Sequence, residues 1–134
     1  MKTLIKSTFI TAFFFTISLA AFAQQATLTI ENNSMRSMTV KIMQGSSKGS
    51  LFNTVIIGAH GKETVYFSET GYYFTKTKAV FKGRDAVFQK GKPFKVVNDE
   101  TGYSEMTLTF TIKESAVPQV MGGQQITKTE FDQN

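Results

Sequence analysis

Hydrophobic and polar residues alternate along most of the chain after position 25. The clearest run is 105–113, where Met106, Leu108, Phe110 and Ile112 alternate with threonine, glutamate and lysine. A period of two with threonine on the polar side is typical of a half-buried antiparallel β-strand. At a helical period the same apolar residues would scatter around the axis. The pattern therefore predicts an all-β domain.

Glycines divide the chain into pieces of strand length, and turn signals at this spacing favour a sandwich or a barrel. The predicted strands are 26–32, 37–44, 51–57, 63–68, 72–82, 86–90, 94–98 and 104–113, with a short ninth near 117–121. The predicted core consists of Leu28, Ile30, Val40, Ile42, Val65, Phe67, Leu108, Phe110 and Ile112. Seven to nine short strands fit a two-layer antiparallel immunoglobulin-like β-sandwich better than a closed barrel.

The C-terminal tail, 123–134, contains the one helix candidate. Thr127 and Glu130 have capping-box spacing, but so few residues form at most one or two turns. We expect one β-sandwich domain over 24–122, followed by this tail.

The first 23 residues have the pattern of a secretory signal peptide. Two lysines supply the positive n-region, the apolar stretch is 10–22, and Ala21-Phe22-Ala23 is a small-x-small cleavage site. The stretch is short for a membrane-spanning helix, which needs about 20 apolar residues; an uncleaved anchor is the competing interpretation. No cysteine follows the cleavage site, which argues against a lipoprotein. We expect a mature chain without a transmembrane helix, exported to the periplasm, the cell surface or the medium.

Composition excludes several kinds of chemistry. The chain has no cysteine, so disulfide scaffolds, thiol catalysis and cysteine-type zinc sites are excluded. His60 is the only histidine and no G-x-S-x-G elbow is present, so we interpret it as a loop residue. We expect no catalytic residues, no metal site and no cofactor. A signal peptide without cysteines favours a bacterial origin.

Positive charge is concentrated in 74–95, which holds seven basic residues against the single acid Asp85, interleaved with aromatic residues. If strand 72–82 is regular, its lysines share one face, while Tyr73 to Phe81 on the other parity face the core. The adjoining turns extend this face if the next strand folds back antiparallel. The candidate binding residues are Lys76, Lys78, Lys82, Arg84, Lys90 and Lys92. Such a surface attracts polyanions; the alternative is that the lysines protect an edge strand.

The segment 28–67 resembles part of a known class of modules. Leu28, Ile30, Asn32 and Ser34 form an L-x-I-x-N-x-S start, and a later loop leads into Thr64-Val65-Tyr66-Phe67. This pattern is similar to the N-domains of periplasmic pilus chaperones and related immunoglobulin-like adhesion modules. The chain lacks the chaperones' second domain, so the resemblance does not imply chaperone activity. As a whole the chain resembles small secreted bacterial β-sandwich proteins of unassigned function.

These features favour a non-catalytic exported binding or interaction module, with an anionic glycan, a cell-envelope component or a protein as its partner. The alternative is a structural or assembly component of a bacterial surface structure that pairs strands at sheet edges. A small hydrolase is the third and weakest hypothesis. Nucleic acid is not expected as a ligand, because the signal peptide directs the chain out of the cytoplasm.

Overall fold

The computed structural model describes residues 25–46, 48–114 and 118–134. The predicted signal peptide and part of the predicted ninth strand lie outside these residues. The described residues form β-strands and one short helix, α3 (Lys128–Asp132), so the all-β prediction is confirmed.

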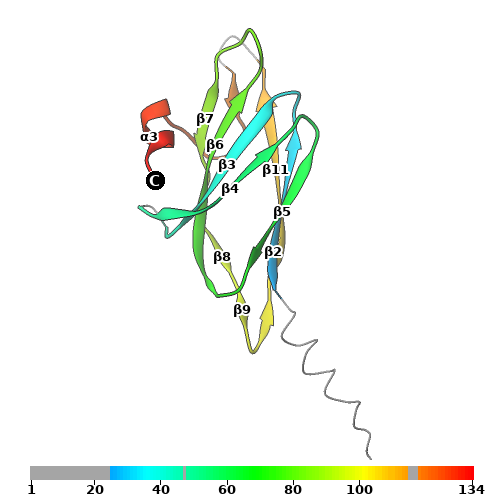
Figure 1. The fold of residues 1–134 in the computed structure, drawn as a ribbon, viewed down its shortest axis with the longest axis vertical. Coiled ribbons are helices and arrows are strands. Elements are labelled where there is room, and N and C mark those ends of the chain that lie inside the picture. The colour runs from blue at the N-terminus through cyan, green and yellow to red at the C-terminus, as the bar shows by residue number, and fades with distance from the viewer. Residues whose placement is uncertain (1–24, 47, 115–117) are drawn as a thin grey trace, which may run out of the picture.

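The strands form two main sheets that face each other (Figure 1). The four-stranded sheet has the order β12-β11-β2-β5, with β2 (Ala26–Asn33), β5 (Lys62–Phe67), β11 (Glu105–Lys113) and β12 (Gln119–Val120). The six-stranded sheet has the order β13-β7-β6-β3-β4, and β8 also pairs with β6. Its strands are β3 (Ser37–Gln44), β4 (Ser50–Ile57), β6 (Gly71–Val80), β7 (Val87–Lys90), β8 (Phe94–Val96) and β13 (Gln124–Gln125). A separate two-stranded sheet consists of β9 (Asn98–Asp99) and β10 (Gly102–Tyr103).

Most predicted strands agree with the observed ones. The strand predicted over 94–98 is divided into β8 and β9, and β10 and β13 were not predicted. One further correction affects the basic segment. The strand predicted over 72–82 ends at Val80, so Phe81 and Lys82 lie beyond the sheet. Phe81 is 39% exposed and does not face the core as expected. The turn Phe81–Arg84, closed by a bond from the Arg84 N–H to the Phe81 carbonyl, follows the strand directly.

One pair of strands is parallel, so the prediction of a wholly antiparallel sandwich is wrong there. β11 runs parallel to β2 over seven residue pairs, from Glu105 opposite Thr27 to Thr111 opposite Asn33. Alternation has the same period in both kinds of sheet and does not report strand direction. The first strand thus lies between β11 and β5, and β3 lies in the opposite sheet. This order differs from the ABED/CFG order of constant-type immunoglobulin domains.

The inner faces of the two sheets share one hydrophobic core. Eight of the nine predicted core residues are buried in it, namely Leu28, Ile30, Val40, Ile42, Val65, Phe67, Phe110 and Ile112. The ninth, Leu108, is half-buried and packs against the cluster. The predicted register of the strands relative to the core is therefore confirmed for both sheets.

Candidate functional site

Four lysines from three neighbouring strands share the outer face of the six-stranded sheet. The register places Lys41 of β3 opposite Lys76 of β6, and Lys76 opposite Lys90 of β7. Neighbouring strands lie about 4.8 Å apart, so these three side chains form one row across the sheet. Lys78 lies two residues further along β6, on the same side. We call Lys41, Lys76, Lys78 and Lys90 the lysine face.

The lysine face is not a means of protecting an edge strand. β6 pairs with β3 on one side and with β7 and β8 on the other. The backbone of β6 is paired with another strand on both sides, so β6 is not an edge strand that Lys76 and Lys78 could protect. The edge-protection interpretation is therefore wrong for these two lysines.

The C-terminal helix α3 lies against the lysine face. It begins where the capping-box spacing predicted, because the Thr127 hydroxyl accepts a hydrogen bond of 3.1 Å from the Glu130 N–H. Lys41 Nζ donates to the Phe131 carbonyl at 2.9 Å and to Asn134 Oδ1 at 2.8 Å. Lys76 Nζ donates to the carbonyls of Glu130 at 2.9 Å and Gln133 at 2.7 Å. Carbonyls at the end of a helix lack partners within it and carry partial negative charge, so the two lysines cap this end.

Phe131 anchors α3 to the same face. It is buried, and Lys41 Nζ lies 4.7 Å and Lys78 Nζ 5.8 Å from the centroid of its ring. Both ammonium groups can interact with the π-face of the ring. The helix therefore covers part of the surface that the sequence suggested as an open anion site.

A pocket of about 400 Å³ remains beside the helix. Its lining consists of Lys48, Gly49, Phe74, Lys76, Lys90, Ile126, Glu130, Gln133 and Asn134. Phe74 is buried, and Lys90 Nζ lies 5.0 Å from the centroid of its ring. Among the described lining residues, three lysines stand against one carboxylate side chain, that of Glu130. We call it the helix-side pocket.

Burial and the positive charges around the pocket lower the pKa of Lys76. Burial is the largest cause that lowers the pKa of Lys76, and the positive charges of Lys41 and Lys90 lower it further, against the opposing effect of Glu130. The protonated amine is thus destabilised by lost hydration and by like charges. A bound anion would offset the repulsion from Lys41 and Lys90.

The six predicted binding residues do not form one surface. Lys76, Lys78 and Lys90 come together on the lysine face. Lys82 lies beyond the end of β6, and Lys92 lies in the connection between β7 and β8. Arg84 Nη1 donates instead to Glu114 Oε1 at 3.1 Å.

Lys41 and Lys48 were missed by the sequence analysis. Lys41 stands between the inward residues Val40 and Ile42, which signals that it points outwards. Its distance from Lys76 depends on the pairing of β3 with β6, which no local pattern reveals.

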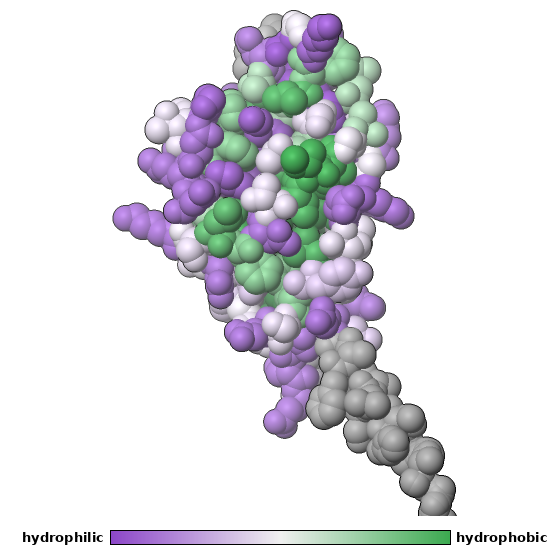
Figure 2. Space-filling model, in the orientation of Figure 1, coloured by the Kyte–Doolittle hydropathy of each residue, from purple (hydrophilic) through white to green (hydrophobic). Residues whose placement is uncertain are grey.

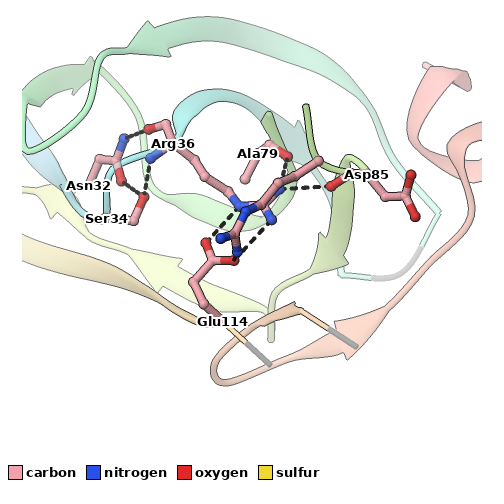
Figure 3. A network of polar contacts seen from close by, with 7 residues as sticks. Asn32, Ser34, Arg36, Ala79, Asp85 and Glu114 are labelled. Carbon is pink, nitrogen blue, oxygen red and sulfur yellow. Dashed lines mark hydrogen bonds and ion pairs between the residues drawn. The ribbon is translucent and has the colours of Figure 1, made fainter. Parts of the chain in front are cut away.

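A second polar site, also missed, is the buried side chain of Arg36 (Figure 3). Its Nε donates to Glu114 Oε2 at 2.8 Å and its Nη2 to Glu114 Oε1 at 3.1 Å. Its Nη1 donates to the carbonyls of Asp85 at 2.8 Å and Ala79 at 3.3 Å. The hydrogen bond from Arg36 is the largest cause that lowers the pKa of Glu114. This site joins β3, the end of β6 and the residue after β11, and its role is structural.

Asn32 and Ser34 hold the backbone that presents Arg36. The Asn32 side-chain amide donates to the Arg36 carbonyl at 2.7 Å, and Ser34 Oγ donates to Asn32 Oδ1 at 2.6 Å. Asn32 Nδ2 also lies within hydrogen-bonding distance of the carbonyls of Ile57 and Gly58. The L-x-I-x-N-x-S start therefore supplies the polar residues of the β2–β3 turn.

His60 lies exposed in the turn between β4 and β5, at a positive φ of 57°. Within the described ranges, no three histidine, cysteine or acidic residues are grouped as metal ligands would be. In the same part of the chain, no helix has the length and apolar character needed to cross a membrane. Comparison with protein-family models, curated proteins and solved structures found no match to this chain.

Proposed function

We propose that the mature domain is an exported, non-catalytic binding module for an anionic glycan or another anionic component of the cell envelope. One observation carries this proposal: Lys48, Lys76 and Lys90 converge on the helix-side pocket, beside the buried ring of Phe74. The secreted bacterial immunoglobulin-like identity belongs to the same proposal. It rests on the resemblance of 28–67 and on the two-layer architecture.

The pocket chemistry suits a sulfated or phosphorylated sugar better than a reaction. The amides of Gln133 and Asn134 line the pocket and can bond sugar hydroxyls, while the lysines attract the charged group. Glycoside hydrolysis generally uses a pair of carboxyl groups, and the described residues of the lining contribute one carboxylate side chain, that of Glu130. Binding without turnover is the function that these residues support.

The test is salt-gradient elution of the mature chain from a sulfated-glycan matrix. Lys48→Gln/Lys90→Gln should elute at lower salt than the wild type, because two counterion-releasing contacts are lost. Lys82→Gln/Lys92→Gln removes the same charge away from the helix-side pocket and should elute close to the wild type. Circular dichroism and thermal melts confirm that both variants are folded. Equal losses in the two variants, or no retention of the wild type, would refute the proposal.

The second candidate is an assembly component that pairs strands at a sheet edge. The observation that favours it is β4, an edge strand of eight residues, Ser50–Ile57, without a single charged side chain. Strand addition at such an edge is an established mode of protein recognition. Self-association that depends on concentration distinguishes this candidate from a monomeric binder.

A further inference from the structure

β4 presents an open edge of the six-stranded sheet. It pairs with β3 on one side, and no described strand pairs with it on the other. Backbone N–H and C=O groups on the free side of such a strand are available to another chain. At least one is already satisfied, because Asn53 Oδ1 accepts a hydrogen bond of 2.8 Å from the Thr54 N–H.

The other described edges have protection that β4 lacks. β5, at the edge of the four-stranded sheet, begins with Lys62 and Glu63. The remaining edge strands are short: β8 has three residues, and β9, β10, β12 and β13 have two each. β4 contains no charge, no proline and no glycine. Its one irregularity is a bulge near Leu51, where the register with β3 shifts. The stretch from Asn53 to Ile57 is therefore a regular, uncharged edge.

Three large apolar side chains of β4 are exposed along this edge. Ile56 is 69% exposed, and Leu51 and Phe52 are each 40% exposed. Figure 2 shows hydrophobic side chains gathered on the face of the molecule that Figure 1 views, where β4 runs. The ring of Phe52 is stacked on Phe67 at 5.2 Å between centroids, so its position is already ordered. An exposed, apolar edge of this kind favours pairing with a further strand.

The absence of charge on β4 indicates which strand pairs with its open edge. Like charges placed opposite each other destabilise a strand pair, and β4 meets its own copy without such repulsion in any register. In a β4–β4 pair, Lys41 and its copy would be three strand spacings apart, about 14 Å. This exceeds the screening length of about 8 Å at physiological ionic strength, so the lysine faces do not oppose the contact.

We propose that β4 pairs antiparallel with β4 of a second copy of this chain, about a two-fold axis perpendicular to the sheet. The contact is isologous and therefore closes at a dimer. It joins the two six-stranded sheets into one continuous sheet, with both lysine faces on the same side. The proposal deepens the assembly candidate above, and it does not depend on the helix-side pocket.

Light scattering after size-exclusion chromatography, over a dilution series, tests the dimer. The wild type should pass from dimer to monomer on dilution. Ile56→Lys should remain monomeric at concentrations about tenfold above the wild-type midpoint, because it removes an apolar side chain from the pairing edge and puts a lysine there, a change that blocks edge-to-edge pairing. The matched control is Tyr66→Lys on β5, where the native side chain is 61% exposed; it should dimerise as the wild type does.

Cysteine scanning tests the geometry, because the chain has no native cysteine. A residue on the two-fold axis meets its own copy at a Cα separation of about 4.5–5.5 Å, within the range of a disulfide. Single cysteines at each position of 53–57 should give one sharp maximum of disulfide-linked dimer under mild oxidation, well above Tyr66→Cys.

Three results would overturn the proposal: a wild type that is monomeric throughout, a dimer that survives Ile56→Lys, or one that Tyr66→Lys abolishes. Elution of Ile56→Lys from the sulfated-glycan matrix is read separately. A monomer that still binds the matrix leaves the anion-binding proposal standing, even if the edge proposal fails.

Discussion

At the scale of single residues, Arg36 is the most constrained polar group. Its side chain is fully buried, yet its guanidinium reaches a carboxylate and two backbone carbonyls. Burying a charge is tolerated only when it is paired and hydrogen-bonded. The planar guanidinium bonds the two Glu114 oxygens from two different nitrogens, a forked geometry that the single nitrogen of an ammonium cannot match.

Replacing Arg36 should destabilise the fold strongly. Arg36→Met keeps the apolar stem but leaves the carbonyls of Ala79 and Asp85 without their donor, so we expect a loss of about 3 kcal/mol in the free energy of unfolding. Arg84→Met is the matched control. The Arg84 side chain is 51% exposed and also contacts Glu114, so its loss should be below about 1 kcal/mol. Urea denaturation measures both, and equal losses would show that burial of Arg36 contributes nothing.

The same pair makes stability depend on pH. The pKa of Glu114 in the folded chain lies below its ordinary value of 4.5, chiefly because of the hydrogen bond from Arg36. The unfolded chain therefore binds the proton more tightly, and stability rises with pH in this range. The contribution is fully present above about pH 5 and disappears as the pH falls through the folded pKa.

Denaturation of Glu114→Gln across this range is the measurement. Its stability should fall short of the wild type at neutral pH, and the difference should shrink as the pH falls. Glu100→Gln, in an exposed loop, is the matched control for the loss of one carboxylate. A Glu114→Gln deficit that is constant with pH would contradict the assignment.

At the scale of secondary-structure elements, α3 and the lysine face depend on each other. A helix of five residues is too short to be stable alone in water. It is held by its N-cap, by the burial of Phe131 and by the lysines at its carbonyl end. These carbonyls occupy donors of Lys41 and Lys76 that an anionic ligand would otherwise use.

Deleting 127–134 should therefore strengthen retention on the sulfated-glycan matrix. The shortened chain frees Lys41 and Lys76 and removes the carboxylates of Glu130 and Asp132 with only one cation, Lys128. It also removes the pocket amides of Gln133 and Asn134. These amides are neutral, so salt-gradient elution, which responds to charge, should still shift to higher salt. Thr127→Ala in the full chain is the milder control; it weakens the N-cap by about 1 kcal/mol and should shift elution less. Unchanged retention of the shortened chain would mean that Lys41 and Lys76 serve only to hold the helix, and weaker retention would mean that Gln133 and Asn134 contribute more to binding than the two freed lysines do.

At the scale of the whole molecule, features set by local sequence patterns were predictable, and features set by the pairing of distant strands were not. The strands and the core were predictable because alternation is local, and Val40, Ile42 and Val65 point inwards as expected. The basic site was only partly predictable. Strand pairing, which no local pattern encodes, brings Lys41 to Lys76 and leaves Lys82 outside the sheet.

The inward direction of the Arg36 side chain could have been predicted from the alternation of its neighbours. It shares the parity of Ser34, Met38 and Val40, all of them buried. Arg36 directly precedes β3 (Ser37–Gln44), and extending the alternation of that strand back by one residue places its side chain on the inner side. Its partner Glu114 lies 78 positions further along the chain, and that distance is why the pair could not be inferred.

The parallel pairing of β2 with β11 has a consequence for the order in which the molecule folds. β2 lies between β5 and β11, and Thr109 bonds Glu31 across 78 positions of chain. Contacts of such high sequence separation require a large loop to close before they contribute, which gives all-β domains refolding times of milliseconds to seconds. The four-stranded sheet cannot be completed until nearly the whole domain has been synthesised. The nascent chain is therefore left without the pairing of β2 with β11 until residues 105–113 have been added, although β2 can already pair with β5 and β3 with β4 and β6.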